Sequence, residues 1–270
     1  MPEGDAVRRT ADRLDRALGG RTLLATDFRV PQLATTNLAG ATVERTATHG
    51  KHLLTRLEQP DGRRLTLHTH LKMEGSWLVL PAGRRWPKPA HEARVVLRVE
   101  GADAVGFTLG LVELLPTADE HTVVGHLGPD LLGAWTADDE DVAVRRLTAD
   151  RDRPLGEALL DQTVVAGLGT IWVAEGCFVH GVSPVTPVGE VQDPRRLLRR
   201  ARLMLQTAVR QGRPVTTGDR REPVWVYRRQ RQACRRCGTT ILAGQLGAPG
   251  RERTTYWCPA CQPTTPPEST

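Results

Sequence analysis

The first apolar stripe of the chain predicts a helix at its start. Val7, Ala11, Leu14 and Leu18 recur at intervals of three to four residues, which is the spacing of one helix face. Asp5 precedes this stripe and is expected to be the N-cap, and Gly19-Gly20 is expected to end the helix. The segment just ahead of Asp5 should therefore be held by a packed helix.

The pattern then changes to short runs of β-type residues separated by turn residues such as Gln59-Pro60-Asp61-Gly62. Many short strands with such turns are typical of a sandwich or barrel. We therefore expect a mainly β domain. The expected strands are Thr22–Phe28, Ala41–Thr48, His52–Leu57, Arg64–His70, Ser76–Leu80, Arg94–Glu100 and Val105–Leu111.

Helical spacing returns after a turn-rich linker, Gly125–Asp130. Thr136 is expected to cap a helix that runs to about Ala149, and Asp193-Pro194 to begin another that ends near Gln211. Between them, Leu155–Val165 and Ile171–Val179 are expected to be helices joined by the turn Ala166-Gly167-Leu168-Gly169-Thr170. Such a turn can point backbone N–H groups at a phosphate, or it can be an ordinary tight helical connection.

Composition and charge limit the possible classes. The 270 residues can bury a sizeable core and are expected to form two domains with a small appendage. No apolar run approaches the length of about 20 residues that a membrane span needs, and the start is polar, so we expect no membrane span and a cytoplasmic protein. Between Asp193 and Arg253 there are sixteen arginines and four acidic residues, although the formal net charge of the whole chain is only +6. This surplus favours a polyanion such as nucleic acid, although a solvated basic face is also compatible with it.

Four cysteines near the C-terminus form two Cys-x2-Cys pairs: Cys234 with Cys237, and Cys258 with Cys261. Two such knuckles match a tetrahedral zinc site, and a site closed by four thiolates is structural rather than catalytic. Disulfides are the alternative, but they are rare in cytoplasmic proteins. Cys177 lies outside the set and is expected to be a buried thiol.

The N-terminal residues Met1-Pro2-Glu3-Gly4 offer a possible nucleophile. If Met1 is removed, Pro2 presents a secondary amine, and an α-amino group titrates near ~7.7–8.0. Such an amine can form a Schiff base, and the carboxylate of Glu3 can act as a general acid or base beside it. A Met-Pro start also occurs by chance, so this interpretation depends on the other motifs.

Taken in order, these motifs resemble the formamidopyrimidine-DNA glycosylase/endonuclease VIII family of base-excision repair enzymes over nearly the whole chain. The matching stretches are Pro2-Glu3-Gly4, Gly50-Lys51, His70-Leu71-Lys72-Met73-Glu74-Gly75, His126-Leu127-Gly128-Pro129-Asp130, Gly167-Leu168-Gly169 and Arg253–Gln262. The resemblance implies an α+β multidomain protein: an N-terminal β-sandwich with an N-terminal helix (1–124), a helical helix-two-turn-helix domain (125–222), a four-cysteine zinc finger (223–262) and a disordered tail (263–270).

By resemblance, Pro2 attacks C1′ of a damaged nucleotide in double-stranded DNA, and Glu3 assists opening of the sugar ring. The Schiff base then allows β- and δ-elimination. Lys51, on a β-strand in the family, would contact phosphate and support the chemistry. Arg253 would bridge phosphate oxygens beside the lesion, and Met73 would fill the gap left by the extruded base.

Three further residues complete the expected DNA contacts by resemblance. His70 would contact phosphate, whereas His68, which alternates with it, is expected to be structural because no third metal ligand is apparent. Gly169 and Thr170 would contact phosphate at the glycine-rich turn. The family usually has asparagine where this chain has Thr170, and a hydroxyl offers one donor instead of two. We expect one structural zinc ion, no membrane association and a monomer.

The chain departs from the family pattern at other places as well. Asp5-Ala6 replaces the Pro-Glu that often follows the first glycine, and the finger loop is somewhat longer than usual. The branch that acts on purine lesions typically has an Arg-Phe pair in a late loop, but Phe107–Leu115 contains none. The absence of this pair and the Pro-Glu-Gly-Asp opening favour the endonuclease VIII branch and oxidised pyrimidines. The alternatives are the same chemistry on oxidised purines, or a zinc-dependent DNA-binding protein without activity.

Overall fold

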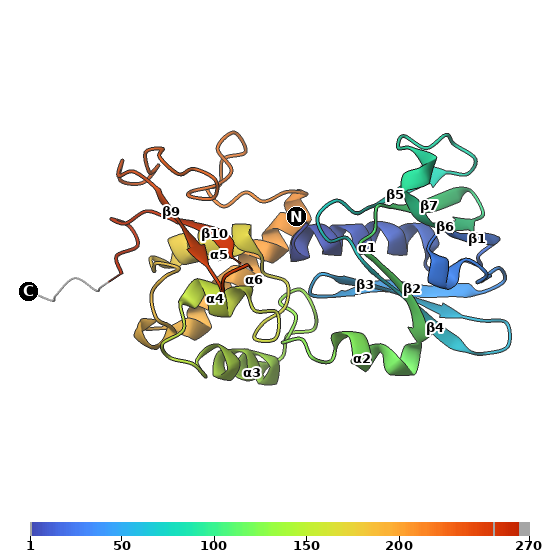
Figure 1. Cartoon of the computed structure of the whole chain (residues 1–270), viewed down its shortest axis with the longest axis horizontal. Helices are drawn as coiled ribbons and strands as arrows, with labels where there is room; N and C mark the ends of the chain where they lie inside the picture. Colours follow the sequence, from blue (N-terminus) through green and yellow to red (C-terminus); the bar gives the residue numbers. More distant parts are fainter. Residues whose placement is uncertain (1, 251, 265–270) are drawn as a thin grey trace, which may run out of the picture. The chain divides into compact units, whose positions relative to one another are not determined.

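The computed structural model describes residues 2–250 and 252–264 and divides the chain into two compact units, Met1–His126 and Leu127–Thr270 (Figure 1). Met1, and the part of the expected disordered tail from residue 265 onward, lie outside the described residues. The second unit contains both the region expected to be helical and the four cysteines. Within the described part of the chain, every helix is too short or too polar to cross a membrane.

The first unit is an antiparallel β-sandwich with one long helix. Its elements are α1 (Gly4–Leu18), β1 (Ala25–Phe28), η1 (Pro31–Leu33), β2 (Thr42–His49), β3 (His52–Glu58), β4 (Arg64–His70), β5 (Ser76–Pro81), η2 (Ala90–Glu92), β6 (Ala93–Val99), β7 (Ala102–Phe107), β8 (Leu111–Pro116), η3 (Thr117–Asp119) and α2 (Glu120–Val124). One sheet has the strand order β1-β6-β7-β5 and the other β2-β3-β4-β8.

Both sheets of this unit contribute to one apolar core. Leu53 and Leu67 of the β2-β3-β4-β8 sheet belong to the same buried cluster as Trp77 and Val95 of the other sheet. The apolar stripe of α1 joins this cluster, and α1 contacts β2, β5 and β7. Because strands alternate their side chains, the residues between these core positions point to the other face of the sheet.

The structure corrects the predicted start of α1. Glu3 is the N-cap, and Asp5 is a buried residue of the first turn whose carboxylate binds Arg9 at 2.6 Å. The predicted end is confirmed, because Gly19 is the C-cap. Asp5 has the residue type of a cap, but its side chain is committed to the i+4 arginine inside the helix.

The expected strand over 105–111 is wrong, because two strands share this apolar run. β7 ends at Phe107 and β8 begins at Leu111, and Thr108 adopts a left-handed conformation with φ 48° between them. The turn Thr108-Leu109-Gly110 contains no Pro or Asn, and the apolar residues on both sides of it were therefore predicted as one strand. β4, in contrast, has the predicted bounds.

Among its described residues, the second unit contains four α-helices and a two-stranded antiparallel sheet. Its elements are α3 (Ala137–Leu147), α4 (Leu155–Leu160), α5 (Thr170–His180), η4 (Val188–Glu190), α6 (Pro194–Gln211), β9 (Leu242–Leu246) and β10 (Arg253–Trp257). Thr136 caps α3 through a capping box with Asp139, and Asp193 caps α6 with Pro194 at its first position. These caps were predicted.

Helix α5 lies between the two apolar clusters of this unit. Trp172 and Val173 pack with α3, α4 and α6, whereas Ala174 and Phe178 pack with the cysteine-bearing segment and its hairpin. Seven consecutive residues from Trp172 to Phe178 are buried, which is the pattern of a helix covered on all sides. The helix expected over 155–165 is shorter, because α4 ends at Leu160 and the Asp161 carboxylate accepts a hydrogen bond from the Thr163 N–H instead.

Candidate active site and cysteine cluster

The N-terminal residues are held against the first unit by α1. Pro2 is half-buried, and Glu3 is only 3% exposed. The Val7 N–H donates to the Glu3 carbonyl at 3.0 Å, which fixes the backbone at the first turn. The apolar stripe behind them packs into the sandwich core, so the position of Pro2 and Glu3 is tied to the fold and is not that of a loose terminus.

Lys51 lies in the two-residue turn between β2 and β3, where His49 pairs with His52. Lys51 therefore immediately precedes the strand that was expected to begin at His52. Gly50 has φ 57°, a conformation that glycine adopts without a steric penalty and that two-residue hairpins require. Lys51 is only 9% exposed, so its ammonium is presented from a rigid and largely buried position.

A tight turn follows β4 and places Met73 in solvent. Met73 is 67% exposed, while the neighbouring Leu71 is buried in the core. The Gly75 N–H donates to the Leu71 carbonyl at 2.9 Å, and a Cβ on Gly75 would lie 2.4 Å from that oxygen. A large exposed apolar side chain on such a fixed turn is available for insertion into a partner.

His70 at the end of β4 has a defined hydrogen-bonding state. Its Nδ1 accepts from the Lys72 N–H at 2.9 Å. Burial, followed by the charges of Lys72 and Lys51, lowers the pKa of His70 to about 4. The imidazole is therefore neutral at neutral pH, and its proton lies on Nε2. A neutral ring in this state can still donate one hydrogen bond to an anion.

The structure also brings together residues that the sequence did not associate with the site. His52 Nδ1 lies 2.8 Å from His68 Nε2, and the His52 ring meets the His70 ring edge to face at 4.9 Å between centroids. His68 Nδ1 lies 3.1 Å from Glu113 on β8. Only the alternation of His68 and His70 hinted at this cluster, because His52 and Glu113 are distant in sequence.

In the second unit, the glycine-rich turn leads directly into α5. Gly169 is the N-cap and Thr170 the first helical residue, so the backbone N–H groups of the first turn point out of the helix start. Gly167 has φ 108°, which favours glycine. The Gln162 amide braces the turn, accepting from the Gly167 N–H at 3.1 Å and donating to the Leu168 carbonyl at 3.0 Å.

The motif that precedes the helices supports the same turn. Pro129 accepts a hydrogen bond from the Ala166 N–H at 3.0 Å, and the Leu131 N–H donates to the Ala166 carbonyl at 3.2 Å. Gly128 is needed here because a Cβ would lie 2.4 Å from the Val164 carbonyl oxygen. The two predicted motifs are thus neighbours in space, and the second unit presents a rigid helix start suited to an anion.

The four predicted cysteine ligands form one cluster. The Sγ atoms of Cys234, Cys237, Cys258 and Cys261 all lie within 4.8 Å of one another. Hydrogen bonds from Thr239 lower the pKa of the Cys237 thiol to about 6, which favours the thiolate that binds metals. The donor set of four soft sulfur atoms can hold a metal ion.

Cys177 differs from these four. Complete burial raises the pKa of its thiol to about 12, so it is an inert core residue, in line with the sequence interpretation. Arg253 is the first residue of β10, the strand that precedes Cys258, and it is exposed.

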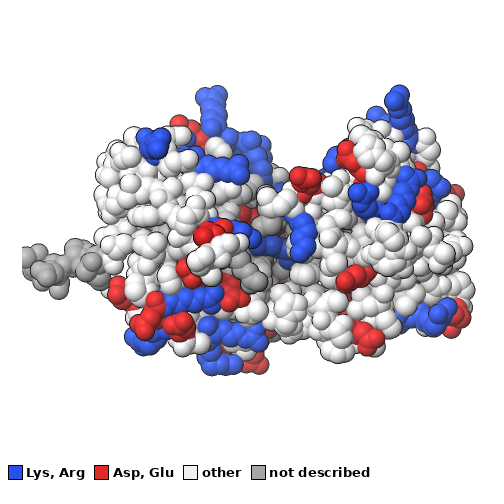
Figure 2. Space-filling view, in the orientation of Figure 1, with Lys and Arg blue, Asp and Glu red and all other residues white. Residues whose placement is uncertain are grey.

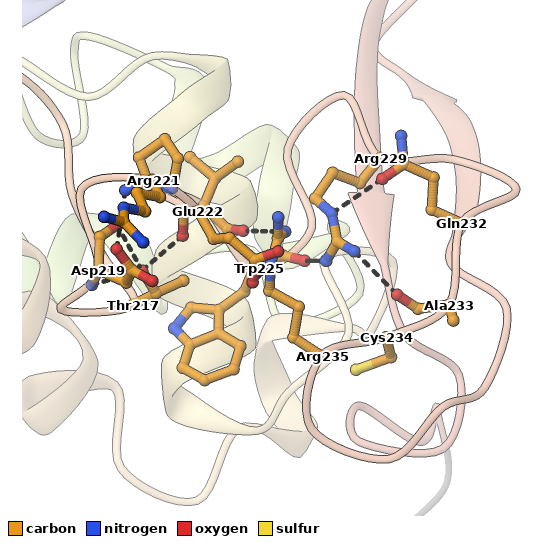
Figure 3. Close-up of polar contacts among 12 residues, drawn as sticks. Thr217, Asp219, Arg221, Glu222, Trp225, Arg229, Gln232, Ala233, Cys234 and Arg235 are labelled. Atoms are coloured by element: carbon orange, nitrogen blue, oxygen red, sulfur yellow. Dashed lines mark hydrogen bonds and ion pairs between the residues drawn. The ribbon is translucent and has the colours of Figure 1, made fainter.

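An arginine-rich segment, residues 213–236, connects α6 to the first cysteine knuckle. Figure 3 shows how its polar groups bind one another: Arg235 pairs with Glu222 at 2.7 Å, and Arg229 donates to the Trp225 and Ala233 carbonyl groups. The carboxylate of Glu175 on α5, which is fully buried, anchors this segment and was not predicted. In Figure 2, basic side chains project from the surface of the second unit.

The fold and these sites define a protein built from an N-terminal β-sandwich with a Pro-Glu start, a helical region with a glycine-rich turn, and a four-cysteine cluster. Residues 1–108 match the formamidopyrimidine-DNA glycosylase N-terminal domain, and residues 127–219 match the H2TH domain of the same family. The chain therefore belongs to the formamidopyrimidine-DNA glycosylase family, as the sequence motifs predicted.

Named relatives match 97% of the chain. A protein called probable endonuclease 8 2 from Streptomyces coelicolor is 48% identical over 97% of this chain and 94% of its own length. DNA-(apurinic or apyrimidinic site) lyase Nei2 from Mycolicibacterium smegmatis is 45% identical over 97% and 99%. The crystal structure of Lactococcus lactis Fpg with DNA containing an oxidised pyrimidine has a TM-score of 0.78 over 97% of this chain and all of its own, at 23% identity, which shows the shared fold.

Proposed function

We propose that this protein is a bifunctional DNA glycosylase and abasic-site lyase of base-excision repair. The observation that carries the proposal is the Pro2-Glu3 start, fixed on the sandwich by α1, in a chain that is 45% identical to a relative named as an abasic-site lyase. A secondary amine beside a buried carboxylate is suited to Schiff-base chemistry. Removal of Met1, which lies outside the described residues, is part of the proposal.

In this mechanism the Pro2 nitrogen attacks C1′ of the damaged nucleotide, and the C1′–N bond to the base breaks. The buried carboxylate of Glu3 exchanges protons with the sugar as its ring opens. The resulting iminium acidifies the C2′–H bond, so loss of that proton expels the 3′ phosphate, and a second elimination expels the 5′ phosphate. Lys51 supplies a fixed positive charge beside the reacting sugar and its phosphates.

The DNA contacts are proposed from geometry and charge. The Nε2–H group of His70 and the helix start at Gly169 and Thr170 each offer donors to phosphate oxygens. Arg253 is exposed and can bind phosphate bidentately. Met73 is proposed to fill the space left by the extruded nucleotide, because it is the exposed apolar tip of a rigid turn.

We propose one structural zinc ion held by Cys234, Cys237, Cys258 and Cys261. When bound, the metal links the two cysteine knuckles and supplies no reactive chemistry, since four thiolates close its coordination sphere. Support comes from Gln262, which accepts from the Cys258 N–H at 2.9 Å and so fixes the second knuckle. The monomeric state and the cytoplasmic location stay predictions.

Oxidised pyrimidines are the proposed substrates. The support is the short connection between β7 and β8, where only Thr108, Leu109 and Gly110 lie between the strands and no Arg-Phe pair is present. Relatives that carry the name endonuclease 8 agree with this branch.

The proposal is tested by incubating the purified protein with matched duplexes that carry thymine glycol, 8-oxoguanine or an abasic site. We expect strand cleavage at thymine glycol and at the abasic site, with slower cleavage at 8-oxoguanine. Faster cleavage at 8-oxoguanine would move the assignment to oxidised purines. Binding without cleavage of any of the three duplexes would favour a DNA-binding protein without activity.

A further inference from the structure

On one face of the β2-β3-β4-β8 sheet, a chain of hydrogen bonds joins His52, His68 and Glu113, and the ring of His70 packs edge to face against the ring of His52. His52 pairs with His70 across β3 and β4, and His68 pairs with Glu113 across β4 and β8. Their neighbours in each strand, such as Leu53, belong to the sandwich core. The alternation of strands therefore places all four side chains on the face opposite the core.

The direction of hydrogen bonding in this chain follows from its carboxylate end. A carboxylate only accepts, so the proton of His68 lies on Nδ1, which is 3.1 Å from the Glu113 oxygen. A neutral His68 then has an acceptor at Nε2. His52 must donate to that acceptor from Nδ1, 2.8 Å away, which leaves the Nε2 of His52 as an acceptor.

His70 has the opposite arrangement. Its Nδ1 accepts from the Lys72 N–H, so its Nε2 carries the proton and donates. Two imidazoles whose ring centroids are 4.9 Å apart thus offer different groups: His70 a donor and His52 an acceptor.

The surroundings keep the histidines neutral, which this assignment requires. Burial, and then the proximity of His70 and His68, with smaller contributions from His126 and Lys72, lower the pKa of His52 to about 3. Burial also lowers the pKa of His68, against the opposing effect of Glu113 and Glu120. At neutral pH each ring therefore has one donor and one acceptor.

We propose that His52 is a further residue of the DNA site, which accepts a hydrogen bond from a hydroxyl group of the damaged sugar, and that Glu113 and His68 are positioning residues for it. An intact DNA backbone offers phosphate oxygens, which only accept, so it suits His70 and not the Nε2 of His52. A hydroxyl appears at C1′ of an abasic sugar and at C4′ when the sugar ring opens. This assignment rests on the proposed function, because it places His52, which follows Lys51 in the chain, beside the reacting sugar.

The test compares two ligands that cannot form a Schiff base. One duplex contains a tetrahydrofuran abasic analogue, which lacks both hydroxyls, and the other contains a borohydride-reduced abasic site, which has an open chain with both. The measured quantity is the ratio of the dissociation constant for the tetrahydrofuran duplex to that for the reduced duplex, obtained by fluorescence anisotropy with the full-length protein.

His52→Phe and Glu113→Leu are expected to lower this ratio about three- to tenfold, the usual contribution of one hydrogen bond. Glu113→Gln should leave the ratio unchanged, because the amide oxygen still accepts from His68. His91→Gln, at an exposed histidine of the same unit, is the matched control. An unchanged ratio in His52→Phe would overturn the proposal, and an unchanged ratio in Glu113→Leu would overturn the positioning role.

A second measurement does not depend on the variants folding. Long-range ¹H–¹⁵N correlation spectra of the wild-type protein at pH 7 should show the proton of His52 on Nδ1 and that of His70 on Nε2. A proton on Nε2 of His52 would overturn the inference. Cleavage of damaged DNA together with that tautomer would contradict this inference alone, whereas failure to bind either abasic duplex would contradict the proposed function as well.

Discussion

Replacement of Glu175 by Gln is expected to destabilise the second unit, because this buried carboxylate organises the start of the arginine-rich segment. Its two oxygens accept from the backbone N–H groups of Trp225 at 2.8 Å and of Val226 and Tyr227 at 2.9 Å each, and from the Thr216 hydroxyl. Glu175 has no measurable exposure to solvent. The carboxylate therefore accepts from four donors in a site closed to solvent.

The size of the effect follows from the hydrogen bonds lost. In Glu175→Gln one oxygen becomes an NH2 group, which faces the Trp225 N–H and the Thr216 hydroxyl. The hydroxyl can rotate to accept, but the N–H is left without an acceptor, at a cost of about 1–3 kcal/mol. The remaining bonds lose the strengthening that a charged acceptor provides, about 1 kcal/mol more. We expect a total loss of about 2–4 kcal/mol.

Urea unfolding followed by tryptophan fluorescence measures this loss, because Trp172 and Trp225 both lie in this unit. The matched control is Asp138→Asn, an exposed acidic residue in the first turn of α3, which should change the free energy of unfolding by a few tenths of a kcal/mol. A change below about 0.5 kcal/mol in Glu175→Gln would refute the view that the carboxylate fixes this segment.

Three further predictions concern metal binding, pH and DNA. Cys258→Ala should abolish stoichiometric zinc in elemental analysis and lower DNA affinity; retention of one zinc per chain would contradict the four-cysteine site. Hydrogen bonds from Arg199 and Arg195 lower the pKa of Glu140 to about 2. The ionised Glu140 therefore stabilises the fold above about pH 4.5, and this stabilisation is lost as the pH falls toward 2. Glu140→Gln should remove this loss of stability at low pH, measured by urea titrations at several pH values, and an unchanged pH profile would argue against it. Met73→Ala should leave thermal stability within about 0.5 kcal/mol but slow excision of a base-paired lesion more than cleavage of an abasic site; equal slowing of both would contradict a role in extruding the nucleotide.

Much of the fold was accessible from the sequence where the pattern and the end signals agree. Helix α6 has the predicted bounds because Asp193, Pro194 and a regular apolar stripe all specify the same helix. The bounds of β4 were predicted for a similar reason, since turn residues flank an alternating run. Between β7 and β8 the prediction joined two strands, because the three-residue turn Thr108-Leu109-Gly110 interrupts a run that is otherwise apolar.

The site was predictable only in part, because its supporting contacts join residues far apart in sequence. Pro2, Lys51 and the four cysteines stand in recognisable motifs. Gln162, which braces the glycine-rich turn, and Glu175, which anchors a segment about 50 residues further on, have no local signal. His52 likewise becomes noticeable only once β3 and β4 are paired. The spacing of residues along the sequence identifies the groups expected to react, whereas the groups that orient them can be identified only in the folded structure.

The central claim is that the nitrogen of Pro2 is the nucleophile. The most direct test incubates the protein with a duplex carrying an abasic site in the presence of borohydride, which reduces a Schiff base to a stable amine. We predict a covalent protein–DNA band whose peptide map places the DNA remnant on Pro2, and loss of that band when Met1 is retained. A trapped adduct on a lysine, or no adduct despite tight binding of the duplex, would contradict the account.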